Sequence, residues 1–306
     1  MTVEIVKLGE PLLAEVKGVD IAHPMNRETA AAVRQAFLDH CVLVFRDQPI
    51  TAEQMVAFEN IFGPPMPHIT KKYTHPEFEE LIVMTNLNER GEVDPFESDR
   101  GVGWHTDMCY LEQPAKATML HTLEIPEVGG DTLFANMYRP LADMPDGLRR
   151  RIDGKRGTFR YGGKVAAERQ ARLDAKDQEA PLVDHPIIRR HSESGRESVY
   201  VNPTHTVGVA GMSEAEGDEL LAEIYEWCDQ ERYQARHQWR MGDTVIWDNR
   251  CTWHSATGDN PKRQRRRFLR GTIADQPPRS DSVANISRRI QLVARALIGA
   301  GVRSDL

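Results

Sequence analysis

The chain has 306 residues, enough for one large domain or two small ones, and enough to bury a sizeable core. With 40% hydrophobic and 28% charged residues, it has the composition of an ordinary globular protein. The formal charge of −7 argues against a general nucleic-acid binder, because binding to phosphates requires positive charge.

The first residues carry no targeting signal. They lack a basic segment followed by an apolar one, and no apolar run approaches the ~20 residues that span a bilayer. None of the four cysteines forms a CxxC pair, and they are too sparse for a disulfide scaffold. We therefore expect a cytoplasmic protein with reduced thiols and no membrane partner.

The N-terminal elements are predicted from hydrophobic patterns and helix caps. Asn26 has the residue type of an N-cap, Thr51 and Gln54 have the spacing of a capping box, and Gly63 is a suitable helix end. The expected order is short strands within 2–20, a helix over 27–40, a buried strand over 42–45 and a helix that begins at 51.

The rest of the chain favours a β-rich fold with long loops. Two loop regions, about 64–103 and about 160–182, are expected to be lids, and about 286–306 a C-terminal helix. Recurring short strands indicate a barrel or a sandwich, and nothing splits the chain, so 1–306 is expected to be one domain. The expected elements are strands at 81–86, 116–123, 131–136, 182–190, 197–202, 243–248 and 265–274, and a helix over 213–230.

A metal site is indicated by the stretch WHTDMCY. His105 and Asp107 are two residues apart, so in an extended segment both side chains point to the same side. Among eleven histidines, His254 is the best third ligand, because it follows an apolar strand and lies among small and bulky residues. Two histidines and one carboxylate match the facial triad that leaves three positions of an octahedral iron open, although zinc also uses this set.

Arginines downstream of His254 add to this hypothesis. By strand alternation Arg266 and Arg270 share one face, whereas Arg265 and Arg267 are expected to be solvated on an edge strand. Two buried guanidinium groups require anions, because an unpaired buried charge costs several kcal/mol. The basic run that contains them is a weak case for nucleic-acid binding in an acidic chain.

These features together resemble the taurine dioxygenase and 2,4-D dioxygenase (TauD/TfdA) family of Fe(II)- and 2-oxoglutarate-dependent oxygenases. The resemblance covers nearly the whole chain. It implies a mainly β fold with flanking helices, a double-stranded β-helix or jelly-roll that is cupin-like and clavaminate synthase-like. The matching segments are EVKGVDIAHPM (15–25), VLVFRDQPITAEQMVAFENIFG (42–63), WHTDMCY, GGDTLFANM (129–137), HSESGRESVYVN (191–202), WDNRCTWHSAT (247–257) and RRFLRGTI (266–273).

The resemblance assigns residues to roles. It implies His105, Asp107 and His254 as metal ligands and catalytic residues, and Thr132 and Arg266 as the binding site for 2-oxoglutarate. The implied reaction uses Fe(II), 2-oxoglutarate and O2 to hydroxylate the substrate, with succinate and CO2 as co-products. Where the hydroxylated carbon bears O, N or S, the bond to that atom then breaks.

The substrate is expected to be a small anion, a sulfonate or a carboxylate, bound by Arg270. His68, Tyr73 and His205 are further candidates for its pocket. Gly101 stands where the taurine enzymes carry Asn, which argues against taurine itself. An aryloxyalkanoate-type dioxygenase is the alternative to a sulfonate enzyme, and the resemblance also implies a homo-oligomer, either dimer or tetramer.

Two rival classes remain at this stage. A non-catalytic β-barrel binding module explains the strands but not the co-occurrence of three metal ligands with Thr132, Arg266 and Arg270. A zinc hydrolase would need an acid or base beside the metal, and it would turn over without 2-oxoglutarate.

Overall fold

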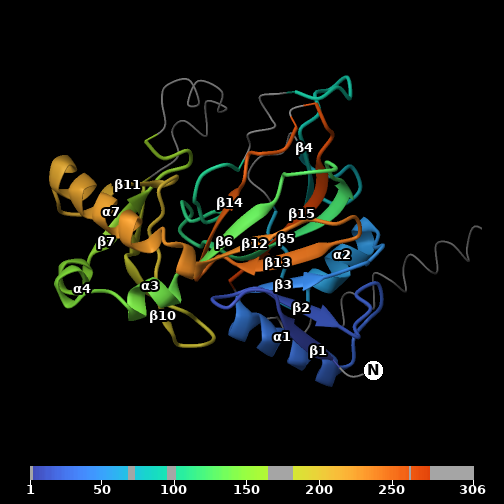
Figure 1. The fold of residues 1–306 in the computed structure, drawn as a ribbon, viewed down its shortest axis with the longest axis horizontal. Helices are drawn as coiled ribbons and strands as arrows, with labels where there is room; N and C mark the ends of the chain where they lie inside the picture. Colours follow the sequence, from blue (N-terminus) through green and yellow to red (C-terminus); the bar gives the residue numbers. More distant parts are fainter. Residues whose placement is uncertain (1–2, 68–72, 95–100, 165–181, 262, 276–306) are drawn as a thin grey trace, which may run out of the picture.

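The computed structural model describes residues 3–67, 73–94, 101–164, 182–261 and 263–275, and within them short strands outnumber helices (Figure 1). The strands are β1 (Glu4–Lys7), β2 (Ala14–Lys17), β3 (Val42–Phe45), β4 (Leu81–Thr85), β5 (Ala115–Glu124), β6 (Thr132–Asn136), β7 (Arg156–Phe159), β8 (Val183–Pro186), β9 (Ile188–Arg190), β10 (Glu197–Val199), β11 (Thr206–Val209), β12 (Gln234–His237), β13 (Thr244–Asp248), β14 (Thr252–Ala256) and β15 (Arg267–Ala274). The helices are α1 (Arg27–His40), α2 (Ala52–Glu59), α3 (Tyr138–Ala142), α4 (Asp146–Ile152), α7 (Glu214–Cys228) and the short 3-10 helix η3 (Glu231–Tyr233).

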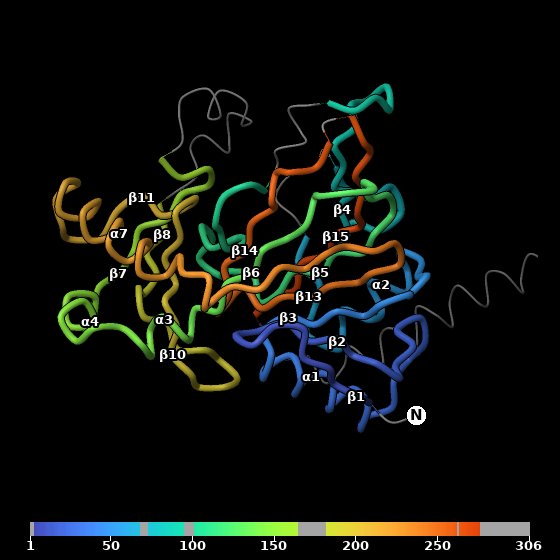
Figure 2. Tube along the Cα trace, viewed as in Figure 1, coloured from blue at the N-terminus to red at the C-terminus, as the bar shows by residue number. Residues whose placement is uncertain are grey.

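The largest sheet has seven strands in the order β1-β2-β3-β13-β5-β15-β4. The N-terminal elements lie along one side of it, so that β3 joins β13 and helix α2 lies beside β15 (Figure 2). A core of buried side chains from α1, α2 and this sheet includes Phe37, Phe45 and Phe58. Burial of such aromatic side chains is the main favourable term in holding the helices to the sheet.

A smaller sheet packs against the large one. It has three strands in the order β12-β6-β14. Phe134 of β6 contacts Trp247 of β13, with ring centroids 5.5 Å apart, and Trp239 contacts Phe268 of β15 at 4.8 Å. The two sheets therefore share a core of aromatic and aliphatic side chains, to which strands β3, β5, β6, β13 and β15 contribute.

A third group of elements lies beside these sheets. Helices α3, α4 and α7 and the sheet β11-β7-β8 form it, next to the small pair β10-β9 (Figure 1). Helix α7 begins with a capping box, in which Ser213 accepts from the Glu216 backbone and the Glu216 side chain accepts from Ser213. Its buried face, which includes Leu220 and Ile224, packs into the same core as Trp253 of β14.

Several predicted boundaries are confirmed and others are wrong. Asn26 caps α1 and the capping box of Thr51 is present, but α2 ends at Glu59, before Gly63. Strand β15 is not an edge strand, because it is hydrogen-bonded to both β5 and β4. Strands β7, β11, β12 and β14 were missed, because polar and small residues weaken their alternation.

Other predictions lie partly or wholly outside the described residues. These are the C-terminal helix at about 286–306 and large parts of the two lid loops. Among the described residues, no helix combines the length and apolar character needed to cross a bilayer.

Candidate metal centre

The segments that carry His105 and His254 are far apart in the sequence, and their backbones are hydrogen-bonded to each other. The amide of His105 donates to the carbonyl of His254 at 3.0 Å, and the amide of His254 donates back at 2.9 Å. Immediately after Asp107, Met108 has a φ of 51°, an uncommon left-handed conformation for a residue with a side chain. Strand β14 therefore presents His254 beside His105, and the chain turns away just past Asp107.

The three predicted ligands converge. One ligand atom from each of His105, Asp107 and His254 lies within 4.8 Å of the others. The Nδ1–H of His105 donates to the carbonyl of Gly103 at 2.8 Å, which leaves the Nε2 lone pair of this imidazole available. Nε2 of His254 lies 3.5 Å from Oδ2 of Asp107. This arrangement is one that a single divalent metal ion can bridge.

The protonation states suit metal binding. Burial lowers the pKa of His105, and burial together with His105 lowers that of His254 still further, so both imidazoles are neutral. Burial opposes ionisation of Asp107, but the guanidinium of Arg270 and the hydrogen bond from Thr118 hold its pKa well below the usual range. Neutral imidazoles and an ionised carboxylate are the forms that bind a metal.

The turn that precedes His254 is fixed by a buried ionic network. Arg250 is fully buried and donates two hydrogen bonds to Asp248, at 2.8 and 2.7 Å. The same guanidinium contacts Glu193 at 2.6 Å, and His191 contacts Asp248 at 2.9 Å. His191, Asp248 and Cys251 have metal-binding side chains within reach of one another, but Asp248 is already neutralised by Arg250. We therefore read this group as a brace for the turn.

A half-buried cation lies near Thr132. Arg266 contacts the carbonyl of Gly130 at 3.3 Å and stacks 4.6 Å over the Phe268 ring, while its Nε has no hydrogen-bond partner among the described residues. Burial lowers the pKa of Arg266 to about 10, so it remains charged at neutral pH. Thr132 accepts a hydrogen bond from the indole of Trp239 at 3.0 Å, which leaves its hydroxyl hydrogen free to donate to a ligand.

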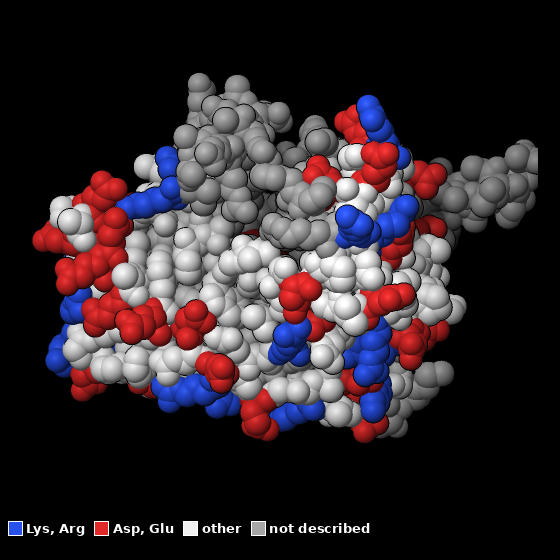
Figure 3. Space-filling model, turned by 45° about the horizontal axis from the view of Figure 1, so that its top comes forward, with Lys and Arg blue, Asp and Glu red and all other residues white. Residues whose placement is uncertain are grey.

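A second arginine contacts the metal ligands directly. Nη2 of Arg270 lies 2.8 Å from Oδ1 of Asp107, and its Nε has no partner in the described part of the chain. By contrast, Arg265 and Arg267 both pair with Glu124, at 2.5 and 2.7 Å. The basic run is thus partly neutralised, and charges of both signs share the face of the molecule seen in Figure 3.

Aromatic rings cluster beside His105. The His205 ring lies 6.1 Å from that of His105 and 5.0 Å from that of Tyr110. The Tyr161 ring stacks on His205 at 6.3 Å and meets Tyr110 at 4.9 Å. These rings form an aromatic wall, defined here as Tyr110, Tyr161 and His205, next to a metal ligand.

The structure brings together most of the residues that the sequence indicates. His68 lies outside the described residues, and Tyr73 lies beside the bridge that joins Thr74 to Ile82. Sequence reasoning missed the hydrogen bonds made by Thr118 and Trp239, and the place of Tyr161 in the wall. Strand register and loop packing decide which residues Thr118, Trp239 and Tyr161 contact, and none of these three belongs to a sequence motif.

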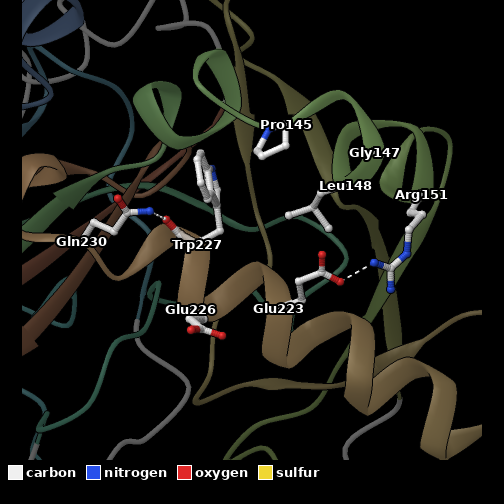
Figure 4. A pocket seen from close by; sticks show the side chains of 8 residues that line it. All are labelled: Pro145, Gly147, Leu148, Arg151, Glu223, Glu226, Trp227 and Gln230. Carbon is white, nitrogen blue, oxygen red and sulfur yellow. Dashed lines mark hydrogen bonds and ion pairs between the residues drawn. The ribbon is translucent and has the colours of Figure 1, made fainter.

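A separate hollow lies between α4 and α7, away from the three ligands. It has a volume of about 670 Å³, and Leu148 and Trp227 line it beside the ion pair of Arg151 and Glu223 (Figure 4). It contains neither a histidine nor a thiol among its lining residues. We assign no catalytic role to it.

Comparisons with known proteins agree with this centre. The family model of the Taurine catabolism dioxygenase TauD, TfdA family matches residues 4–272. The chain is 30% identical over 255 residues to an alpha-ketoglutarate-dependent 2,4-dichlorophenoxyacetate dioxygenase of Cupriavidus pinatubonensis, a match that covers 80% of this chain and 88% of that protein. It is 28% identical over 298 residues to an (S)-phenoxypropionate/alpha-ketoglutarate-dioxygenase of Sphingobium herbicidovorans, with 92% and 98% covered. The crystal structure of AAD-2 with Mn(II) and N-oxalylglycine superposes with a TM-score of 0.78 at 28% identity, covering 91% of this chain and 98% of that chain.

Proposed function

The chain belongs to the TauD, TfdA family, and on that premise we propose how its residues divide the work of dioxygenation. It is a 2-oxoglutarate-dependent non-haem iron dioxygenase with a jelly-roll fold, and its substrate is a small anion. The family, the fold class, the reaction class and the cofactors predicted from the sequence are thereby confirmed.

Fe(II) would be held by His105, Asp107 and His254. Their neutral imidazoles and ionised carboxylate fit a divalent metal, and their convergence is the single observation that carries the proposal. When bound, the iron supplies the oxygen chemistry, in which 2-oxoglutarate is converted to succinate and CO2 while the substrate is hydroxylated. The protein contributes ligation, orientation and exclusion of water.

The far carboxylate of 2-oxoglutarate would bind to Arg266 and Thr132. The Nε of Arg266 supports this, because this buried nitrogen has no hydrogen-bond partner among the described residues, and a buried cationic donor without an acceptor favours an anion beside it. A planar guanidinium also holds a carboxylate through two parallel hydrogen bonds, which fixes the orientation of the ligand. Thr132 would add one further donor, which the indole of Trp239 directs away from the sheet core.

The substrate would place its anionic group near Arg270 and an aromatic ring against the aromatic wall. The unpartnered Nε of Arg270 supports the first contact, and the rings of Tyr110, Tyr161 and His205 support the second. Relatives whose names carry aryloxyalkanoate substrates also favour an aryl-bearing carboxylate. We therefore propose an aryloxyalkanoate-type substrate, which is the alternative expected from the sequence, ahead of a sulfonate.

Succinate release across a panel of substrates tests this proposal. Purified enzyme with Fe(II), 2-oxoglutarate and O2 is assayed with aryloxyalkanoates and with alkyl sulfonates. We expect substrate-coupled succinate from the first group, none in Asp107→Ala, and a strongly raised KM in Arg270→Ala. Coupling to sulfonates alone would overturn the substrate class, and an unchanged KM would remove Arg270 from substrate binding. Turnover without 2-oxoglutarate would instead support a hydrolase.

We further propose a cytoplasmic homo-oligomer, either a dimer or a tetramer. The four cysteines are unpaired and buried, which suits a reducing compartment. Sedimentation of the purified protein measures its assembly directly, and a monomer at enzyme concentrations would refute the oligomer. His68 and Tyr73 remain predicted contacts of the substrate.

A further inference from the structure

One oxygen of Asp107 is held by a chain of hydrogen bonds that begins at Trp247. The indole N–H of Trp247 donates to Oδ1 of Asn249 at 3.1 Å, and Nδ2 of Asn249 donates to Oγ1 of Thr118 at 2.9 Å. The hydroxyl of Thr118 then donates to Oδ2 of Asp107 at 2.7 Å. All four side chains are buried. This donor chain, from Trp247 to Asp107, runs from the core of the large sheet to the metal centre.

The direction of the donor chain is fixed by chemistry. An indole nitrogen only donates, so the amide oxygen of Asn249 must face Trp247 and its NH₂ must face Thr118. A threonine hydroxyl has one hydrogen, and because this hydroxyl accepts from Asn249, that hydrogen is directed to Asp107. Thr118 and Trp247 are also opposite one another in the pairing of β5 with β13, so backbone register holds these two members of the donor chain together.

A competing cation acts on the same carboxylate. Arg270 contacts the other oxygen of Asp107, and a guanidinium group readily takes both oxygens of a carboxylate in a bidentate pair. Rotation of Asp107 into such a pair would remove a metal ligand. The hydroxyl of Thr118 opposes that rotation, because turning Asp107 away would leave the buried hydroxyl hydrogen of Thr118 without an acceptor.

We propose that Thr118, oriented by Asn249 and Trp247, is a positioning residue that holds Asp107 ready for the metal and away from full pairing with Arg270. The proposal rests on the assignment of Asp107 as a metal ligand made above. Loss of an outer hydrogen-bond partner of a ligand typically lowers metal affinity about 10–100-fold. We expect an effect in that range when the hydroxyl of Thr118 is removed.

The test is a calorimetric titration of the metal-free protein with Mn(II), carried out without 2-oxoglutarate. Thr118→Val keeps the shape and loses the hydroxyl, whereas Thr118→Ser keeps the hydroxyl. Thr244→Val is the matched control, because Thr244 is a buried threonine of the same sheet whose hydroxyl contacts His121 outside the donor chain. Trp247→Phe removes the first donor and leaves a smaller aromatic ring beside His254.

The expected result is about 10–100-fold weaker Mn(II) binding in Thr118→Val. Thr118→Ser and Thr244→Val should bind as the wild type does, and Trp247→Phe should fall in between. Thermal unfolding in the presence of a chelator separates affinity from folding. Thr118→Val with wild-type affinity would overturn the positioning role alone. Wild-type protein that fails to bind Mn(II) would overturn the metal centre as well.

Discussion

Glu59 on α2 offers a direct probe of how burial controls stability. Its side chain is fully buried, and neither carboxyl oxygen has a hydrogen-bond partner among the described residues. Burial, reinforced by the charge of Glu80, raises its pKa well above the usual value, so the folded protein holds the neutral acid. The substitution Glu59→Gln keeps the shape and removes the ability to ionise.

The sign and size of the effect follow from the two pKa values of Glu59. In the unfolded chain this carboxyl group titrates near the ordinary pKa of about 4.3. Below that pH the carboxyl group is protonated in both the folded and the unfolded state, so it does not make the free energy of unfolding depend on pH. As the pH rises toward the raised folded pKa, only the unfolded state gives up its proton, and the free energy of unfolding falls by about 1.4 kcal/mol per pH unit. Glu59→Gln lacks this loss.

Chemical denaturation measured at a series of pH values that begins at the ordinary pKa of glutamate and rises from there checks this prediction. The stability of Glu59→Gln relative to wild type should rise by about 1.4 kcal/mol per pH unit through that window. Glu53→Gln is the control, because Glu53 is exposed on the same helix, and its curve should parallel that of the wild type. Parallel curves for Glu59→Gln and wild type would refute a neutral buried acid.

Three further predictions concern packing, cosubstrate binding and metal retention. A β-carbon at Gly271 would overlap the carboxyl group of Glu59. Gly271→Ala should therefore lower the free energy of unfolding, measured by chemical denaturation, by about 1–3 kcal/mol, and by less in a Glu59→Ala background. Equal losses in both backgrounds would contradict the contact. Trp239→Phe should raise the KM for 2-oxoglutarate and leave Mn(II) affinity unchanged, because it frees the hydroxyl of Thr132 to rotate; an unaltered KM would remove this role. Mn(II) affinity measured by titration should fall as the pH drops below the usual imidazole range, because both imidazole ligands bind in their neutral form, and a pH-independent affinity would argue against histidine ligation.

The fold could be predicted where local signals act alone. The predicted caps Asn26 and Thr51 coincide with true helix starts, since such caps satisfy backbone amides within a few residues. Strand β14 escaped prediction although it carries His254, because its pairing partner β6 decides its conformation and its short sequence TWHSA lacks a clear apolar alternation. The internal position of β15 likewise depends on distant partners, so its arginines alone suggested an edge.

In the candidate site, too, some residues could be predicted from the sequence, whereas the contacts between them could not. The types and spacing of His105 and Asp107 predict a ligand pair, and the resemblance adds Arg266. Neither predicts that Arg270 contacts Asp107, because a strand pattern gives a face and not a distance. Thr118 belongs to no motif either, and only the register of β5 with β13 brings it to the donor chain.

The reciprocal amide bonds between His105 and His254 affect how the protein acquires its ion. They hold the two imidazoles side by side across a long loop, so folding of the backbone meets the ordering cost of bringing these two ligands together. Metal binding need not supply that free energy, in contrast to small zinc domains whose folding depends on the metal.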